Sequence, residues 1–580
     1  MAEYRGWAVV GVALASFVLS STMLGNVAGV SPATAAAATH PGSALAAKKK
    51  AGKGTLKIVV TGSGSYTVTG KGFRKTGSAS RSFKVKPGRY IVKSSAGSVT
   101  PGTVKVRKGK VLQVRVTFPQ AVTPAPTPTP ALTPTPNPTI APSPDPTVAP
   151  TSTPTPTPTL TPGMTGDVQR VSTNASGGQA NGQPYSDPVW SPDGTRVAFL
   201  SDADDLVPGD TNNATDVFVK TLASGVIQRV STDAAGAQGN RDAADGPSWS
   251  PDGSKIAFTS RATNLVPDDF MGAEDVFIKT LATGAIERIS TDATGFQADG
   301  SSYDPAWSPD GTKVAFDSEA ENLVPDDTNN TTDIFVKTLA TGAIQRISTD
   351  AAGGQASGGM WGVHFSSDPA WSPDSTKVAF LSSVDNLVPG DTNNATDAFV
   401  KTLATGAIQR ISTDASGSQS NEDCSYGLSW SPDGTKIAFT SDASNLVPGD
   451  TNSDPDVFIK TIGTGSIELI STNSTGTQGN GDSYGPVSWS PDGSRIAFTS
   501  FAANLVPGDA NNAPDVFVKT LATGASQLIS ADATGAQGDA SSDDPAWSPE
   551  GTKIAFLSVA DNLVPGDTNG MNDVFVKTLP

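Results

Sequence analysis

An acidic, asparagine-rich stretch recurs along the sequence, first as LVPGDTNNATDVFVKTL at Leu206–Leu222. In most copies an Asp, an Asn two positions later and an Asp six positions after the first supply carboxylate and amide oxygens. Ca²⁺ takes about 6–8 oxygen ligands of this kind. The spacing therefore predicts Ca²⁺ as a cofactor. The candidate ligands are Asp210, Asn212, Asp216, Asp327, Asn329, Asp333, Asp391, Asn393, Asp397, Asp450, Asn452, Asp454, Asp456, Asp509, Asn511, Asp515, Asp567, Asn569 and Asp573.

The best of these candidate metal sites is the ladder Asp450, Asn452, Asp454 and Asp456, because it brings the most charge. An alternative stays open for every copy. Asn and Asp also shape loops by bonding their own backbone, without any metal. The degraded copy that starts at Leu265 lacks the pattern.

Residue combinations suited to catalysis are scarce. The chain has two histidines, His40 and His364, and one cysteine, so a zinc site is not expected. Gly481–Gly485 reads GDSYG, which fits the Gly-x-Ser-x-Gly pattern of a nucleophile elbow. That pattern needs a preceding strand, a following helix and a His/Asp pair. Other repeats have SSYD and CSYG at this place, so the repeat itself explains the match.

The stretches that position these loops repeat with a fixed period. The marker is Trp-Ser-Pro-Asp-Gly, whose tryptophans are separated by 59, 58, 64, 59, 59 and 58 residues. They are Trp190, Trp249, Trp307, Trp371, Trp430, Trp489 and Trp547. One period, such as residues 245–291, contains four strand-like runs and no helical pattern. This content predicts one propeller blade per period, and therefore a seven-bladed β-propeller over 164–580.

The two ends of the repeat region are complementary. It opens with a fourth-strand sequence and ends with a third-strand sequence. We therefore expect Val168–Ser172 to pair beside Val574–Thr578 and to complete the last blade, which covers an otherwise open sheet edge. The short turns are expected on one face of the ring and the long acidic loops on the other.

The repeats WSPDGTRVAF, WSPDGSKIAF and WSPDGTKIAF resemble the TolB-type β-propeller repeat, which also occurs in prolyl oligopeptidase-like peptidases. Ser375 and Glu550 depart slightly from the pattern. The resemblance implies the propeller fold. It also implies an envelope role in which the propeller binds a partner protein, although the N-terminal α/β domain of TolB is not evident here.

One repeat carries a longer loop, SGGMWGVHFSSDPAW, with six additional residues. Aromatic residues on exposed loops are typical interface anchors. We therefore predict partner-binding residues Met360, Trp361, His364 and Phe365. The alternative is that Trp361 folds down and covers the mouth of the central channel.

The N-terminal part divides by composition. Residues 1–38 read as a signal peptide, with Arg5 before an apolar run and small residues near Ala36–Ala38, or as a membrane anchor if uncleaved. A basic segment, 39–53, precedes alternating strand patterns over 54–118 that weakly resemble small β-sandwich modules of bacterial surface proteins. Residues 119–163 contain sixteen prolines and predict an extended linker.

Charge differs sharply between the two folded parts. Residues 48–118 hold eighteen Lys/Arg and no Asp or Glu, whereas the chain from 119 onward holds 21 basic and 55 acidic residues. For an exported chain, the basic segment favours an anionic envelope polymer as partner over nucleic acid.

These features predict an all-β, exported protein of the periplasm or cell surface. We expect a binding or scaffold protein that uses its acidic loop-rich face for a protein or glycan partner. The alternative is a propeller-based hydrolase or lyase.

Overall fold

A computed structural model of the chain describes the strands between residues 54 and 117, with gaps between them, and residues 165–580 apart from 358–364 and 426. Its contacts divide the chain into two units, Met1–Pro150 and Thr151–Pro580. The predicted signal peptide, basic segment and linker, residues 1–53 and 119–163, lie outside the described residues. No helix in the described part is long and apolar enough to cross a membrane.

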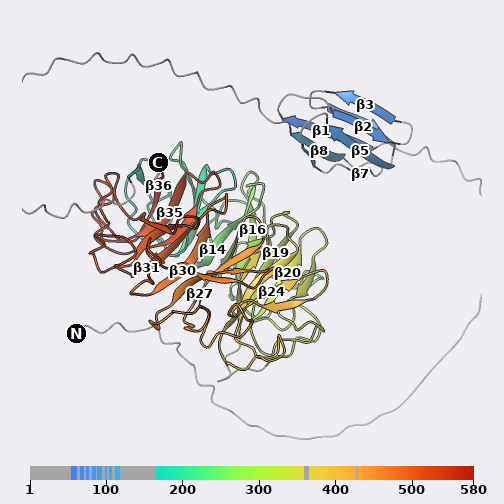
Figure 1. Cartoon of the computed structure of the whole chain (residues 1–580). Coiled ribbons are helices and arrows are strands. Elements are labelled where there is room, and N and C mark those ends of the chain that lie inside the picture. Colours follow the sequence, from blue (N-terminus) through green and yellow to red (C-terminus); the bar gives the residue numbers. More distant parts are fainter. Residues whose placement is uncertain are drawn as a thin grey trace, which may run out of the picture. The chain divides into compact units, whose positions relative to one another are not determined.

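The N-terminal unit contains two four-stranded sheets, shown in blue in Figure 1. One sheet has the order β4-β1-β8-β6 and the other β3-β2-β5-β7, and β1 runs parallel to β8. Their side chains Leu56, Ile58, Val68, Tyr90 and Val92 are buried. The strands are β1 (Gly54–Thr61), β2 (Tyr66–Gly70), β3 (Phe73–Gly77), β4 (Arg81–Val85), β5 (Gly88–Ser94), β6 (Ser98–Thr100), β7 (Thr103–Val106) and β8 (Val111–Thr117).

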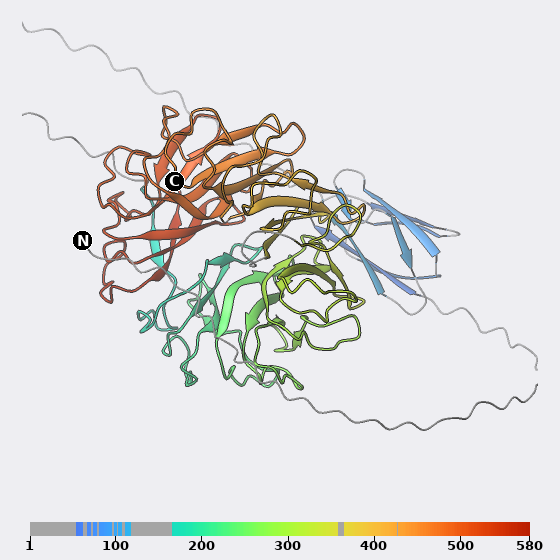
Figure 2. The same ribbon diagram turned by 90° about the horizontal axis from the view of Figure 1, so that it is seen from below.

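In the second unit the described strands form seven four-stranded antiparallel sheets, the number that the seven repeated tryptophans predict. They are arranged around a centre (Figure 2) and are called blades one to seven in chain order. Blade one contains β10 (Val189–Trp190), β11 (Arg196–Ser201), β12 (Asp216–Thr221) and β13 (Ile227–Arg229). Blade two contains β14 (Ala243–Trp249), β15 (Lys255–Ser260), β16 (Asp275–Thr280) and β17 (Ile286–Arg288). Blade three contains β18 (Ser302–Trp307), β19 (Lys313–Ser318), β20 (Asp333–Thr338) and β21 (Ala343–Arg346).

The remaining blades repeat this order. Blade four contains β22 (Ser366–Trp371), β23 (Lys377–Ser382), β24 (Asp397–Thr402) and β25 (Ile408–Arg410). Blade five contains β26 (Ser429–Trp430), β27 (Lys436–Ser441), β28 (Asp456–Thr461) and β29 (Ile467–Leu469). Blade six contains β30 (Ser483–Trp489), β31 (Arg495–Ser500), β32 (Asp515–Thr520) and β33 (Ala525–Leu528). Blade seven contains β34 (Ser542–Trp547), β35 (Lys553–Ser558), β36 (Asp573–Thr578) and β9 (Val168–Arg170).

The core lies between neighbouring blades. The second and third strands of each blade are buried on both faces, so they read as apolar runs such as Arg196–Ser201 rather than as alternating patterns. Phe199 and Phe218 lie side by side within blade one, with ring centroids 6.0 Å apart. Each of the remaining six blades has the equivalent pair. Seven apolar clusters each join two successive blades, and one of them joins blade one to blade seven. The blades therefore form a closed ring.

The closure occurs as the sequence predicts. β9 pairs antiparallel with β36, with Gln169 opposite Val576 and Arg170 opposite Phe575. The prediction of an all-β chain is confirmed for the described residues.

Candidate functional site

The first strand of most blades carries a bulge beside the ring axis. In blades two, three, four, six and seven its register with the second strand shifts just before the tryptophan motif. At the shift, Asp245, Asp304, Asp368 and Asp544 have φ of 53°, 48°, 54° and 53°, and Gly485 has 77°. Asp tolerates this left-handed conformation better than most residues because its short polar side chain can bond locally. The bulges thus place a carboxylate at one level of several blades.

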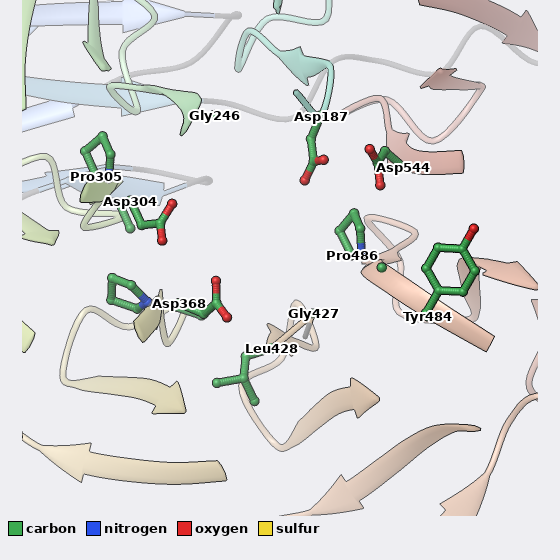
Figure 3. Close-up of a pocket in the computed structure, with 14 residues that line it drawn as sticks. Asp187, Gly246, Asp304, Pro305, Asp368, Gly427, Leu428, Tyr484, Pro486 and Asp544 are labelled. Carbon is green, nitrogen blue, oxygen red and sulfur yellow. The ribbon is translucent and has the colours of Figure 1, made fainter. Parts of the chain in front are cut away.

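Three of these aspartates, Asp304, Asp368 and Asp544, line a cavity of about 530 Å³ on the ring axis together with Asp187. The carboxylates of Asp187, Asp304, Asp368 and Asp544, from four different blades, point into it in Figure 3. None of the described residues that line it is Lys or Arg. The remaining lining residues are Gly246, Pro305, Ala306, Pro369, Ala370, Gly427, Leu428, Tyr484, Gly485 and Pro486.

Burial and mutual repulsion make these carboxyl groups weak acids. Burial raises the pKa of Asp304 to about 7, with further contributions from Asp368 and Asp187. Burial and the charge of Asp187 raise the pKa of Asp368 to about 6. The pKa of Asp187 lies well above its usual range, because of burial and then of the neighbouring Asp544. The hydrogen bond between these two groups favours a neutral Asp187 that donates to an ionised Asp544.

Further carboxyl groups lie close to these four, among them Asp317 and Asp245. Asp317 in β19 is 4 % exposed, and its Oδ1 has no hydrogen-bond partner in the described part of the chain. Burial, followed by the charges of Asp304, Asp368 and Asp245, raises the pKa of Asp317 well above its usual range. For Asp245, burial and Asp304 raise the pKa to about 7. A positive charge placed near these carboxyl groups would therefore lower their pKa values and favour their ionised forms.

The sequence analysis did not predict the four carboxylates that point into the cavity, which we call the channel carboxylates. A signal for them was nevertheless present in the sequence. An Asp-Pro pair stands three residues before the tryptophan in four repeats, at Asp187, Asp304, Asp368 and Asp544. A carboxylate that recurs just ahead of an inner strand is a candidate for the ring axis.

The predicted metal loops carry a different arrangement. In each loop, the Asp of the loop and the Asp that opens the third strand form what we call the loop carboxylate pair. In blade one, Arg229 Nη1 lies 2.7 Å from Asp210 Oδ1 and 3.4 Å from Asp216 Oδ2. An arginine occupies the same place in blades two, three, four and seven, as Arg288, Arg346, Arg410 and Arg170. In four of these loops, those of blades one, three, four and seven, a guanidinium lies beside the carboxylates that the sequence analysis assigned to Ca²⁺.

The other predicted ligands of these loops serve the same network. Asn212 Nδ2 donates to Asp216 Oδ2 at 2.9 Å and to the carbonyl oxygen of Gly239 at 2.9 Å, and Asn329 makes the equivalent bonds in blade three. Asn393 donates to Asp397 in blade four, whereas Asn569 in blade seven donates to the carbonyl oxygen of Ala180. Ca²⁺ at the loops of blades one, three, four and seven stays a prediction, although an arginine already pairs with the carboxylates there.

Blades five and six lack the arginine. Leu469 and Leu528 stand at its place, opposite Phe458 and Phe517 in the third strands, as Arg229 stands opposite Phe218. Gln537 Nε2 donates to both members of the blade-six pair, Asp509 Oδ1 and Asp515 Oδ2, at 2.7 Å each. Asn511 donates to Asp515 at 3.0 Å.

Most of the predicted partner-binding loop lies outside the described residues. Met360, Trp361 and His364 lie outside the described residues, so their role stays a prediction. Phe365 is partly buried, and its backbone is tied to the blade by a bridge to Thr332 and by the amide of Ser383, which donates to the Phe365 carbonyl at 3.1 Å.

Comparisons with known proteins agree with this architecture. No family model matches the chain. Dipeptidyl-peptidase 5 of Porphyromonas gingivalis is 28% identical over 165 residues, which is 28% of this chain and 20% of that protein. The chain thus spans about a fifth of that relative's length.

Solved structures similar to the chain include TolB proteins and other β-propellers. TolB from Acinetobacter baumannii has a TM-score of 0.35 at 19% identity, over 61% of this chain and 66% of that one. An oligogalacturonate lyase in complex with manganese has a TM-score of 0.44 at 16% identity, over 73% and 96%. The β-propeller domain of the trilobed protease from Pyrococcus furiosus has a TM-score of 0.40 at 13% identity, over 68% and 95%. The strand pairing of the chain itself makes it a β-propeller, and these likenesses add neither a family nor a role.

Proposed function

We propose that the chain is an exported binding protein, and that its channel carboxylates receive a positively charged segment of a protein partner. One observation carries the proposal. Asp187, Asp304, Asp368 and Asp544 converge on a single cavity that no Lys or Arg of the described chain lines.

The physical reason is the electrostatic repulsion between the carboxylates that line the cavity. Several carboxyl groups at close range cannot all ionise, which is why burial and neighbouring charges raise the pKa of Asp304 to about 7. A lysine or arginine side chain entering the cavity would lower these pKa values and stabilise the ionised groups. The apolar part of the lining, such as Pro305, Leu428 and Pro486, suits the aliphatic stem of such a side chain.

The experiment uses the full chain and a fluorescein-labelled octalysine peptide as probe, with binding followed by anisotropy at neutral pH. We expect the double variant Asp304→Asn/Asp368→Asn to bind the probe at least about tenfold more weakly, since it removes two of the converging charges. Asn retains the side-chain size and tolerates positive φ, so the bulges should persist.

The matched control is Glu422→Gln/Glu468→Gln, which removes the same number of carboxyl groups from exposed positions. Equal loss in both double variants would mean that the probe senses only overall charge, and the channel proposal would be wrong. Binding of neutral oligosaccharides but not of octalysine would point to a glycan partner instead.

The N-terminal unit supports a second binding function. Arg74, Lys75, Lys84 and Lys93 are exposed on its strands, and Lys86 is exposed directly after β4. We propose that this basic surface binds an anionic envelope polymer. Counterion release makes such binding weaken steeply with salt. Retention of the full chain on immobilised polyphosphate should therefore fall as NaCl rises, and retention that does not change with salt would contradict this proposal.

A further inference from the structure

Exposed apolar side chains gather on two loops of blade two. Phe270 and Met271, in the loop between β15 and β16, are 80 % and 56 % exposed. Phe296, in the loop that follows β17, is 71 % exposed. The two phenylalanines are the most exposed large apolar side chains in the described part of the chain. We call these three residues the blade-two patch.

The two loops that carry the patch lie side by side. Gln297 follows Phe296 directly, and its Oε1 accepts from the backbone amide of Phe270 at 3.5 Å. Its Nε2 donates to Asp269 Oδ1 at 3.1 Å. One glutamine side chain thus joins both loops next to both phenylalanines, so the patch is a single surface feature.

The other six repeats carry no large apolar residue at these three places. Threonine or alanine stands at the place of Phe270, asparagine at that of Met271, and Gly, Ala, Ser or Thr at that of Phe296. Since six blades fold without them, the propeller does not need these apolar side chains for its fold. A cluster of exposed apolar side chains without a role in folding is typical of an interaction surface.

One charged side chain lies at each end of the Phe270–Met271 pair. Asp268 precedes Phe270 by two residues and is exposed. Beyond Met271, the guanidinium of Arg241 lies over Gly272, since a Cβ added to that glycine would be 2.5 Å from Arg241 Nη1. No other repeat has an arginine at the place of Arg241. Within the described part of the chain, neither Asp268 nor Arg241 forms an ion pair.

This order of groups is complementary to itself. One copy presents a carboxylate, an apolar pair and a guanidinium, and a second copy turned by 180° presents them in the reverse order. Asp268 of each copy then faces Arg241 of the other, while the apolar side chains meet between the two ion pairs. Symmetric dimers use the same surface on both partners in this way. Aromatic residues, Met and Arg are also the residues enriched at protein–protein interfaces.

We propose that the blade-two patch is the contact surface of a symmetric dimer of this chain. Contacts among Phe270, Met271 and Phe296 hold the two copies together, and two ion pairs between Asp268 and Arg241 set their orientation. Small interfaces, which bury less than about 1,200 Å² in total, belong to weak and transient complexes. We therefore expect a dimer that dissociates on dilution.

The first test replaces the apolar pair with the residues of blade one. Sedimentation equilibrium of the full chain between about 1 and 500 µM measures the dimer Kd. Phe270→Thr/Met271→Asn should raise that Kd at least about tenfold, because both copies lose their aromatic anchor. The fold should be kept, since blade one carries this Thr-Asn pair.

The matched control for this variant is Met571→Ala. It removes an exposed apolar side chain from the equivalent loop of blade seven, at a place where blades one, four and six have alanine. The control should leave the dimer Kd unchanged. An equal loss of association in both variants would mean that no particular surface holds the dimer, and the proposal would be overturned.

Arg241→Gln and Asp268→Asn test the orientation of the two copies. Asn tolerates the positive φ of 63° that Asp268 adopts. Each single variant should raise the dimer Kd about threefold or more, since both symmetric ion pairs are lost. The double variant should add little to either single one, because the two side chains belong to the same pair. Independent effects of the two changes would show that these side chains do not meet across the interface.

The inference is wrong if the wild type stays monomeric at the highest concentration. It is also wrong if Phe270→Thr/Met271→Asn dimerises as tightly as the wild type, because another surface, such as the basic N-terminal unit, would then hold the dimer. A monomeric wild type that binds phosphatidylcholine vesicles, with binding lost in this variant, would assign the patch to a lipid surface instead. Binding of octalysine should be the same in this variant and the wild type, so the dimer and the channel are tested separately.

Discussion

Gln169 and Val576 lie opposite each other in an antiparallel pair that joins the first strand of the propeller to its last blade. The same junction brings Arg170 Nη1 to 3.0 Å from Asp567 Oδ1, and Ser172 Oγ donates to the buried Asp573. The two ends of the ring are therefore joined by backbone pairing, by an ion pair and by a buried hydrogen bond.

Deletion of residues 165–173 should lower the Tm more than an equally long deletion of residues 130–138 in the proline-rich segment. The first deletion exposes the edge of β36 and leaves Asp573 without its serine and arginine partners. Thermal unfolding followed by circular dichroism measures the difference. Equal Tm values for both deletions would show that the closing strand contributes nothing to stability.

Hydrogen bonds from a buried lysine also join neighbouring blades. Lys279 Nζ in blade two donates to the carbonyl and hydroxyl oxygens of Thr232 at 2.6 and 2.8 Å, and to the carbonyl of Asp233 at 2.8 Å, all beyond the end of blade one. Lys279→Met should lower the free energy of unfolding by about 1–3 kcal/mol, because these oxygens lose their donor.

The matched control is Lys577→Met in blade seven, where Ala531 replaces the threonine and only two carbonyl contacts exist. Its cost should be smaller than that of Lys279→Met in urea unfolding. A larger cost at Lys577 would mean that packing of the lysine stem, rather than hydrogen bonding, governs the interaction.

The sequence predicts the architecture because its signals are local and repeated. Trp190 and the residues after it define a strand, a tight turn and a second strand in each period, and the incomplete first and last periods define the closure. The partners of the acidic loops could not be predicted in the same way. Arg229 in β13 follows Asp210, which lies in the loop before β12, by nineteen residues, and only strand pairing brings the two together.

The channel set illustrates a second limit. Asp304 and Asp368 belong to neighbouring blades, and their convergence depends on ring closure and on a bulge with positive φ. A single repeat contains the bulge but not the ring closure that brings the carboxylates of different blades together.

The repeated tryptophans are expected to contribute unequally. Trp489 Nε1 donates to the carbonyl oxygen of Ser429 in the preceding blade at 3.1 Å, whereas Trp307 Nε1 has no hydrogen-bond partner in the described chain. Both side chains are buried to a similar degree, 7 % and 8 % exposed. Trp489→Phe should therefore destabilise the protein by about 1 kcal/mol more than Trp307→Phe. Urea unfolding monitored by circular dichroism checks this, and a reversed order would refute the role of the indole hydrogen bond.

The last prediction concerns pH and the channel carboxyl groups. Asp304 faces Asp368 and Asp187 across the cavity, with Asp317 and Asp245 behind it. Burial and these neighbours raise the pKa of Asp304 and Asp245 to about 7, and that of Asp368 to about 6. A group whose pKa is higher in the folded than in the unfolded state binds its proton more tightly when folded. Its contribution to stability is therefore lost as pH rises through the folded pKa.

The free energy of unfolding should accordingly fall between pH 5 and pH 8 in the wild type. The double variant Asp304→Asn/Asp368→Asn isolates the effect, because it removes two titrating groups while keeping their size. Calorimetry should show the variant gaining stability over the wild type at pH 8 and losing that advantage at pH 5.

Asp492→Asn is the control with the opposite sign. Hydrogen bonds from Ser490 and Ser494 lower the pKa of Asp492 to about 2, so its loss should destabilise the protein at both pH values. If the channel variant differs from the wild type by the same amount at pH 5 and pH 8, these carboxyl groups do not repel one another in the folded ring, and the electrostatic basis for a cationic partner is lost.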